Sequence, residues 1–428
     1  MSDGEIILKR PTQILSDDII KFTQDIECLH TTLPLFMTIM GHIEKETHGK
    51  YHRFIDDHST DKSNNGNQTT YSIKVDDIAK HDRLKHQYDN SNNALRLIPR
   101  HFITSLVSQY DSFLGCVIRF VFSVKPQILN ASEKSIPFTD LIEFSSIDAA
   151  REYIIEKEVE TVIRKSHVEQ FSWLKEKLGT PFNKDLKSWP VFVELNECRN
   201  LFVHCDGRVS SQYLKICSEH KCNIDDKLTV GDQLNVSPIY FEEAYKCVYE
   251  IGVKLAHVIW RRLAPDHLSE SDISINQITY SLIDKGEFEI AIRLLDFFTQ
   301  DQIKHSTDVN KRMMIINRAQ AYKWAKDDAT CKEILSVPDW SASGDNFKLA
   351  VEVLNENYDA AYNLMKRLKH DESFHKAYYK DWPLFRELRK QTAFTSVYED
   401  CYGEPFKVQQ KTEEGKPSTV ELANQPVS

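Results

Sequence analysis

Helical periodicity is the feature of this sequence that most constrains its fold. Between Ser16 and about His48, apolar residues recur three and four positions apart, as on one face of an amphipathic helix. They are Ile19, Phe22, Ile26, Leu29, Leu33, Phe36, Met40 and Ile43. Pro34 lies inside this run and is expected to kink it. From Leu95 to Val124 both faces are rich in apolar residues, which predicts a helix central to a core or to a subunit interface. With only 13 glycines in 428 residues, the composition also favours helices, and the sequence predicts an all-α fold.

Three segments lack a strong helical pattern. Asp57 to Thr70 is polar and rich in Asn, which predicts a flexible insertion near 52–92. Leu228 to Val236 alternates weakly between apolar and polar residues and predicts a short hairpin or an extended crossing. The end of the chain, 404–428, is polar and predicted to be disordered. By contrast, 149–178 reads as one continuous helix.

The stretch WPVFVELNECRNLFVHCDG predicts a helix with a marked start and stop. Ser188 suits the N-cap and Pro190 the first turn, and Gly207 can take the left-handed conformation that ends a helix. Arg199 and His204 are five residues apart, so a regular helix places them about 140° apart and not on one face. Either the helix loosens at its end, or a second copy of the chain completes a site.

These residue types suit RNA cleavage without a metal ion. Histidine has the side-chain pKa that allows proton transfer at a 2′-hydroxyl or a leaving oxygen near neutral pH. Arg199 supplies fixed charge for a crowded phosphate, and we expect Arg208 and Lys215 to extend a basic substrate-binding surface. The plainer alternative is an ordinary ion pair for Arg199 and a His204 that caps the carbonyl groups of the helix end.

The sequence RNLFVH, followed by CDGRVSSQYL, resembles the R-x4-H signature of the HEPN superfamily, in which a polar residue commonly follows the arginine. Asn200 takes that place, while Cys198 departs from the charged residue that often precedes the arginine. The segments YDSFLG, PFTDLIEF, VEQFSWL and VIWRRL match the layout of bacterial members, so that the resemblance covers roughly 90–264. It implies a helical bundle that dimerises along the motif helix. It also implies that Arg199, Asn200 and His204 are catalytic in a metal-independent endoribonuclease of a toxin or phage-defence system, although some members are inactive scaffolds.

Beyond Pro265 the pattern changes to paired helices. Breaks are predicted at Lys285-Gly286, at Lys326-Asp327 and at 355–357, and their spacing of roughly 30 to 40 residues is typical of stacked helical pairs. This part resembles tetratricopeptide repeats, which present concave surfaces to peptides or partner proteins. The predicted organisation is therefore a HEPN-type bundle over 1–264 and a repeat array over 265–403. A helical lid that only stabilises the first domain is the alternative for the second.

Charge and cysteine usage narrow the function further. A net charge of −10 argues against a surface covered by nucleic acid but permits a small basic site. The nine cysteines form no disulfide-like framework, and we find no signal peptide and no run of membrane-spanning length, so we expect a reduced, cytoplasmic protein. Cys217, His220 and Cys222 are close in sequence but lack a second pair at zinc-ligand spacing, and no metal or cofactor is expected.

Three functions follow as hypotheses. The first is RNA cleavage by a homodimer, with an antitoxin or a peptide as the partner of the repeats. The second is a non-catalytic dimeric adaptor that binds a protein through its repeats. The third is nucleotide binding or nucleotidyl modification at the same basic cluster.

Overall fold

The structure is a computed structural model that describes residues 9–65, 68–131, 134–182, 186–372 and 374–406. It confirms the all-α fold class: helices dominate, and the described residues contain one two-stranded sheet. The chain divides into two compact units. The first contains the residues up to Ile278 together with Gln302–Asn310, and the second contains Thr279–Asp301 and the residues from Lys311 onward. Most of the tail predicted to be disordered, from 407 on, lies outside the described residues.

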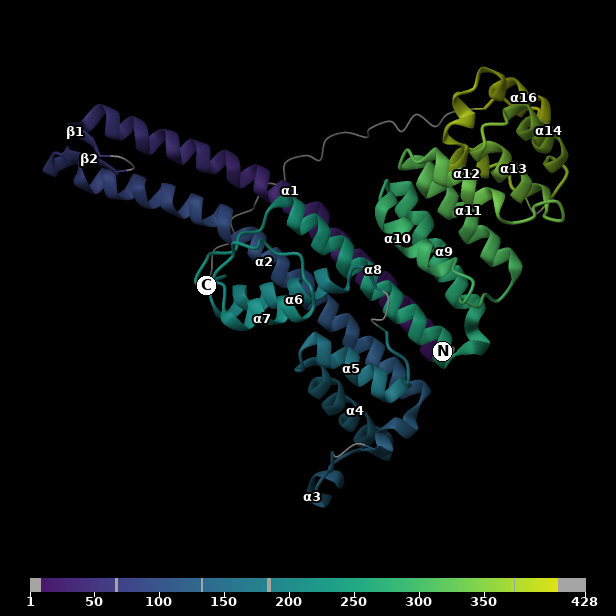
Figure 1. The fold of residues 1–428 in the computed structure, drawn as a ribbon, viewed down its shortest axis with the longest axis horizontal. Coiled ribbons are helices and arrows are strands. Elements are labelled where there is room, and N and C mark those ends of the chain that lie inside the picture. The colour runs from purple at the N-terminus through teal and green to yellow at the C-terminus, as the bar shows by residue number, and fades with distance from the viewer. Residues whose placement is uncertain (1–8, 66–67, 132–133, 183–185, 373, 407–428) are drawn as a thin grey trace, which may run out of the picture. The chain divides into compact units, whose positions relative to one another are not determined.

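Three long helices build the first unit. Helix α1 (Pro11–His58) and helix α2 (Ile78–Val124) pair along their length, and α8 (Pro238–Leu263) packs against both (Figure 1). In the predicted apolar stripe Ile19, Phe22 and Ile26 are buried and Leu29 is half-buried, whereas Phe36 and Ile43 farther along are 49% and 40% exposed. Helix α1 continues through Pro34 as a single helix.

A β-hairpin joins the far ends of α1 and α2, where the sequence predicts a flexible insertion. Strand β1 (Ser59–Asn65) pairs antiparallel with β2 (Gln68–Ile73), and a 3₁₀ turn, η1 (Val75–Asp77), leads into α2 (Figure 1). The hydroxyl of Tyr71 lies 2.8 Å from that of Tyr51 on α1 and 3.1 Å from Nε2 of His81 on α2. The insertion that the sequence predicts to be flexible thus contains a hairpin, and Tyr71 ties this otherwise polar segment to the helix pair.

The centre of the first unit depends on a close approach between α1 and α8. The ring of Phe22 on α1 stacks on that of Phe113 on α2, with centroids 4.2 Å apart. A Cβ atom at Gly252 of α8 would lie only 2.4 Å from Cε1 of Phe22. Glycine at this position therefore permits α8 to pack directly over the stacked rings.

Shorter helices surround this frame. They are α3 (Phe138–Leu141), α4 (Ile147–Ile163), α5 (His167–Leu178), α6 (Trp189–His204) and α7 (Ser211–Glu219), with the 3₁₀ turn η2 (Pro126–Ala131) before them. The continuous helix predicted over 149–178 is wrong, because Ser166 begins a new helix, α5, through a capping box with Glu169. The segment 228–236 forms no paired strand among the described residues; one isolated bridge joins Gln233 to Arg208.

A buried carboxylate holds the segment Gln302–Asn310 in the first unit. Asp272 is fully buried and lies 2.6 Å from Nη2 of Arg261 and 3.1 Å from Nδ1 of His305. It also accepts hydrogen bonds from the backbone N–H and the hydroxyl of Ser306, each at 2.7 Å. Burial by itself raises the pKa of Asp272, but these bonds and the charge of Arg261 outweigh it and hold the pKa well below its ordinary value. This part of the chain therefore extends the first unit past the predicted boundary near 264.

Helix pairs form the second unit, into which the last part of α9 (Leu268–Lys285) extends. The helices that follow are α10 (Phe288–Phe298), α11 (Asp308–Trp324), α12 (Asp328–Ser336), α13 (Asp345–Leu354) and α14 (Tyr358–Leu368). The chain ends with α15 (Tyr378–Asp381), the 3₁₀ turns η4 (Pro383–Arg386) and η5 (Leu388–Lys390), and α16 (Thr392–Tyr402). The three breaks predicted between paired helices are confirmed.

One turn geometry recurs at all three breaks. Gly286, Lys326 and Glu356 have positive φ angles of 86°, 68° and 63°. The next backbone N–H in each case bonds the carbonyl five residues earlier, which is the Schellman arrangement of a helix end. A small buried residue follows five positions after each turn, at Ala291, Cys331 and Ala361. The repeats are therefore built on a shared structural unit despite their irregular spacing.

Within the described part of the chain, none of the helices combines the length and apolar content that crossing a lipid bilayer demands.

Candidate functional site

A buried carboxylate fixes the position of helix α6. Glu194 is 9% exposed and accepts hydrogen bonds from the hydroxyls of Tyr213 on α7, at 2.7 Å, and of Tyr240 on α8, at 2.8 Å. Burial raises the pKa of Glu194, and the two tyrosine hydrogen bonds oppose that rise. One side chain thus holds α6 against both neighbouring helices.

A buried arginine holds the loop that follows α6. Arg100 of α2 donates to the backbone carbonyls of Asp206, at 3.0 Å, and Leu234, at 2.7 Å, and its guanidinium lies over the ring of Phe202. Gly207 has the predicted positive φ, 75°, and a Cβ there would meet the Phe202 ring at 3.0 Å. The end of α6 is therefore a fixed structure rather than a loosened turn.

Arg199 is held in an ion pair that reaches across three helices. Its Nη2 lies 2.6 Å from Oδ2 of Asp111 on α2, and its Nη1 donates to Oδ1 of Asn200 at 3.2 Å. The other oxygen of Asp111 lies 2.8 Å from Nε2 of His167, at the start of α5. The structure thus brings Arg199 and Asn200 together and places Asp111 and His167 beside them.

Sequence reasoning missed Asp111 and His167. Asp111 lies within the motif YDSFLG, but apolar spacing singles out its neighbours rather than the carboxylate. The signal for His167 is the sequence SHVE, in which Ser and Glu at capping-box spacing mark a helix start that the continuous-helix interpretation passed over.

His204 lies in the last position of α6 and is exposed. No hydrogen bond or ion pair joins it to another of the residues that the structure describes. Because α6 is regular up to this residue, Arg199 and His204 point to different sides of the helix. Asn200 and His204, four residues apart, share one face. A single chain therefore offers Asn200 and His204 together but not Arg199 with His204.

The two predicted substrate-binding residues lie outside this group. Arg208 is exposed and donates to the carbonyl of Gly231 at 3.3 Å. Lys215 is exposed on α7, with its Nζ atom 3.9 Å from Glu219.

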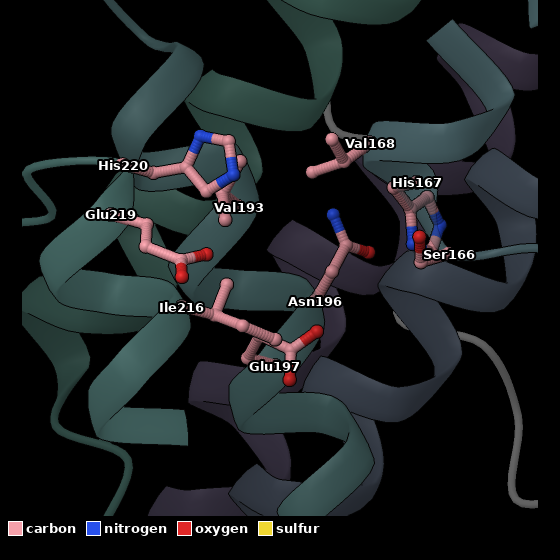
Figure 2. A pocket seen from close by; sticks show the side chains of 9 residues that line it. All are labelled: Ser166, His167, Val168, Val193, Asn196, Glu197, Ile216, Glu219 and His220. Atoms are coloured by element: carbon pink, nitrogen blue, oxygen red, sulfur yellow. The ribbon is translucent and has the colours of Figure 1, made fainter. Parts of the chain in front are cut away.

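A pocket of about 170 Å³ lies between the start of α5, the middle of α6 and the end of α7 (Figure 2). Its lining residues are Ser166, His167, Val168, Val193, Asn196, Glu197, Ile216, Glu219 and His220. Burial raises the pKa of Glu197, and the neighbouring His167 opposes that rise. Asn196 is 3% exposed, and its Oδ1 has no hydrogen-bond partner within the described structure.

In the described ranges, no three His, Cys, Asp or Glu side chains cluster so that they could hold a metal ion. No protein-family model, curated protein or solved structure matches this chain.

Proposed function

We propose that this chain is a HEPN-type endoribonuclease that cleaves RNA without a metal ion, in which His204 transfers protons and Arg199 and Asn200 bind the scissile phosphate. The observation that carries the proposal is the state of His204. It is exposed and unpartnered in the described structure, and it sits one helical turn beyond an asparagine that Arg199 already contacts.

The proposed active unit is a dimer joined along α6. Because Arg199 and His204 diverge around one helix, Arg199 of one protomer would complete the site that contains His204 of its partner. The exposed Val203, beside His204, supplies apolar surface for such a contact. The function of the second unit in this proposal is to bind an inhibitor or a recruiting peptide, as helical repeats do.

The proposed reaction needs only proton transfer and charge stabilisation. One His204 accepts the proton of the ribose 2′-hydroxyl, and the 2′-oxygen attacks the phosphorus. The bond from phosphorus to the 5′-oxygen breaks, that oxygen takes a proton from water, and the imidazolium of His204 returns its proton to the solvent. Arg199 stabilises the charge that develops on the phosphate. The products are a 2′,3′-cyclic phosphate and a 5′-hydroxyl.

Removal of the imidazole tests the proposal. Purified wild-type protein should cleave RNA in EDTA and leave cyclic phosphate ends, and His204→Ala should lower the rate by at least about a hundredfold. The matched control is His370→Ala, which removes another exposed histidine. Because His204 is exposed, the variant should unfold at the same denaturant concentration as wild type. Equal cleavage by both variants, or none by wild type, would refute the nuclease.

The ion pair between Arg199 and Asp111 favours a second candidate, the non-catalytic adaptor. The carboxylate of Asp111, 2.6 Å from Arg199, already neutralises the positive charge that Arg199 would have to offer to a phosphate. In that case wild type would cut no RNA, and substitutions on the surface of the second unit would abolish binding of its protein partner.

A further inference from the structure

The pocket beside α6 offers no fixed positive charge to a phosphate, since the basic side chains among its described lining residues are the imidazoles of His167 and His220. Glu197 and Glu219 contribute two carboxylates, and the described lining contains no lysine or arginine. Val168, Val193 and Ile216 add apolar walls. An occupant must therefore offer N–H donors at one edge and an uncharged or cationic body elsewhere.

Asn196 supplies an independent sign of a missing partner. Its Nδ2 donates to the carbonyl of Phe192 at 2.6 Å, which fixes the orientation of the amide and leaves Oδ1 as a buried acceptor to which none of the described residues donates. Figure 2 shows this amide between Val193 of α6 and His167 of α5. The hydroxyl of Ser166 does not serve it, since that group bonds Glu169 at 2.7 Å. A ligand donor would satisfy Oδ1.

The pocket and the proposed catalytic residues share one face of α6. Val193, Glu197, Asn200 and His204 succeed one another at spacings of four, three and four residues, which keeps them in one row along the helix. At about 1.5 Å per residue, Glu197 precedes His204 by roughly 10 Å along the axis. A group in the pocket thus lies about one nucleotide from the imidazole.

We propose that this pocket binds the guanine base of an RNA nucleotide next to the scissile phosphate, with Glu197 and Asn196 accepting hydrogen bonds from its N1–H and N2–H₂ groups. The inference rests on the proposed ribonuclease function and adds its base specificity. Guanine presents two adjacent donors that match the two oxygens of a carboxylate. Adenine and cytosine place an acceptor beside their amino group, and uracil flanks its single N–H with two carbonyls, so each would turn a lone pair toward Glu197.

The size of the pocket also suits a purine. Cavities of about 150 Å³ are known to hold a benzene ring, so a partly open pocket of about 170 Å³ admits the leading edge of a purine.

The test is a binding titration that does not depend on cleavage. The four nucleoside 3′-monophosphates and agmatine, a guanidinium probe, are titrated by calorimetry into the full-length His204→Ala variant. Guanosine 3′-monophosphate should bind at least about tenfold more tightly than the other three nucleotides, as expected for one bidentate pair. Tighter binding of agmatine would overturn the proposal, because the pocket would then read a guanidinium, such as an arginine of a partner protein. Equal binding of all four nucleotides, or none, would also overturn it.

Three further variants in the same background locate the base. Glu197→Gln keeps the shape but leaves one acceptor, and should weaken guanosine 3′-monophosphate binding about tenfold or more. Val168→Trp should also block binding, by filling the pocket. Glu176→Gln is the matched control, because it removes a carboxylate that is 72% exposed on α5 and outside the pocket.

The direction in which Glu197→Gln changes nucleotide affinity distinguishes recognition of the base from attraction of the phosphate. If the nucleotide bound only through its phosphate, removal of a negative charge would leave binding unchanged or make it tighter, and the proposal would fail. If guanosine 3′-monophosphate binds but the wild type does not cleave RNA, the proposed nuclease function is refuted and the base-binding pocket is not. If the wild type cleaves RNA but shows no preference for guanine, only the proposed guanine-binding pocket is refuted.

Discussion

At the scale of the residue, Asp111 determines the electrostatic environment of Arg199. Sequence spacing identifies the arginine and the histidine but gives no indication that a carboxylate eighty-eight positions earlier lies 2.6 Å from the guanidinium. The same carboxylate contacts His167, which lines the pocket beside α6. Asp111 therefore orients one side chain of the proposed phosphate site and one of the proposed base site.

Glu194 gives a residue-scale prediction about pH. Burial raises its pKa above the ordinary 4.5, so the folded state holds this proton more tightly than the unfolded chain does. The stabilising contribution of the group is complete below its unfolded pKa and is lost as the pH rises through its folded pKa. The free energy of unfolding of wild type, relative to that of Glu194→Gln, should therefore fall from acidic to neutral pH.

Chemical denaturation at mildly acidic and at neutral pH measures this difference. Glu176→Gln, at an exposed site, is the control for the loss of a carboxylate that is not buried. A difference between wild type and Glu194→Gln that stays constant with pH would contradict a raised pKa at Glu194.

At the scale of the element, two glycines inside helices differ in how closely neighbouring atoms approach them. Gly252 lies on α8, where an added Cβ would approach Phe22 to 2.4 Å. Gly115 lies on α2, where the nearest atom to an added Cβ is a methyl of Val159 at the ordinary distance of 3.6 Å. Both glycines lie in helical sequence patterns, and only the packing separates them.

Alanine at these two positions should have opposite effects. Gly252→Ala should lower the free energy of unfolding by about 1–3 kcal/mol, because the Phe22 ring is buried against Phe113 and has little room to move. Gly115→Ala should leave it unchanged or raise it by up to about 1 kcal/mol, through the better helix propensity of alanine. Urea denaturation of both variants checks this, and equal effects would refute the packing argument.

At the scale of the whole molecule, the sequence predicts the type of architecture better than its connections. Helical spacing predicts the all-α class, and turn residues predict the breaks near Gly286, Lys326 and Glu356, because these signals are local. The hairpin was missed because its attachment is a tertiary contact of Tyr71. Asp111, His167 and the pocket were missed because four separate helices supply them. The dimer stays a prediction.

Mixing two inactive variants tests the dimer. If Arg199 of one protomer serves His204 of its partner, Arg199→Ala and His204→Ala should each be inactive alone. Mixed, they should recover about a quarter of wild-type ribonuclease activity, since random pairing makes half of the dimers mixed and each holds one complete site of two. Mixing Arg199→Ala with the double variant should restore nothing. Absence of recovery in the first mixture would rule out a site shared between protomers.

The return of Gln302–Asn310 to the first unit has a consequence for any attempt to divide the protein. The chain passes between its units at 278–279, at 301–302 and at 310–311. A gene fragment that stopped near 264 would keep Arg261, whose side chain is 10% exposed, but discard Asp272, the buried carboxylate 2.6 Å from its guanidinium. A single protease cut at 278–279 would separate the first unit from its own segment Gln302–Asn310. A single cut at 301–302 or 310–311 would leave the two units covalently joined. The smallest self-sufficient piece is thus discontinuous in sequence, and this protein is best manipulated whole.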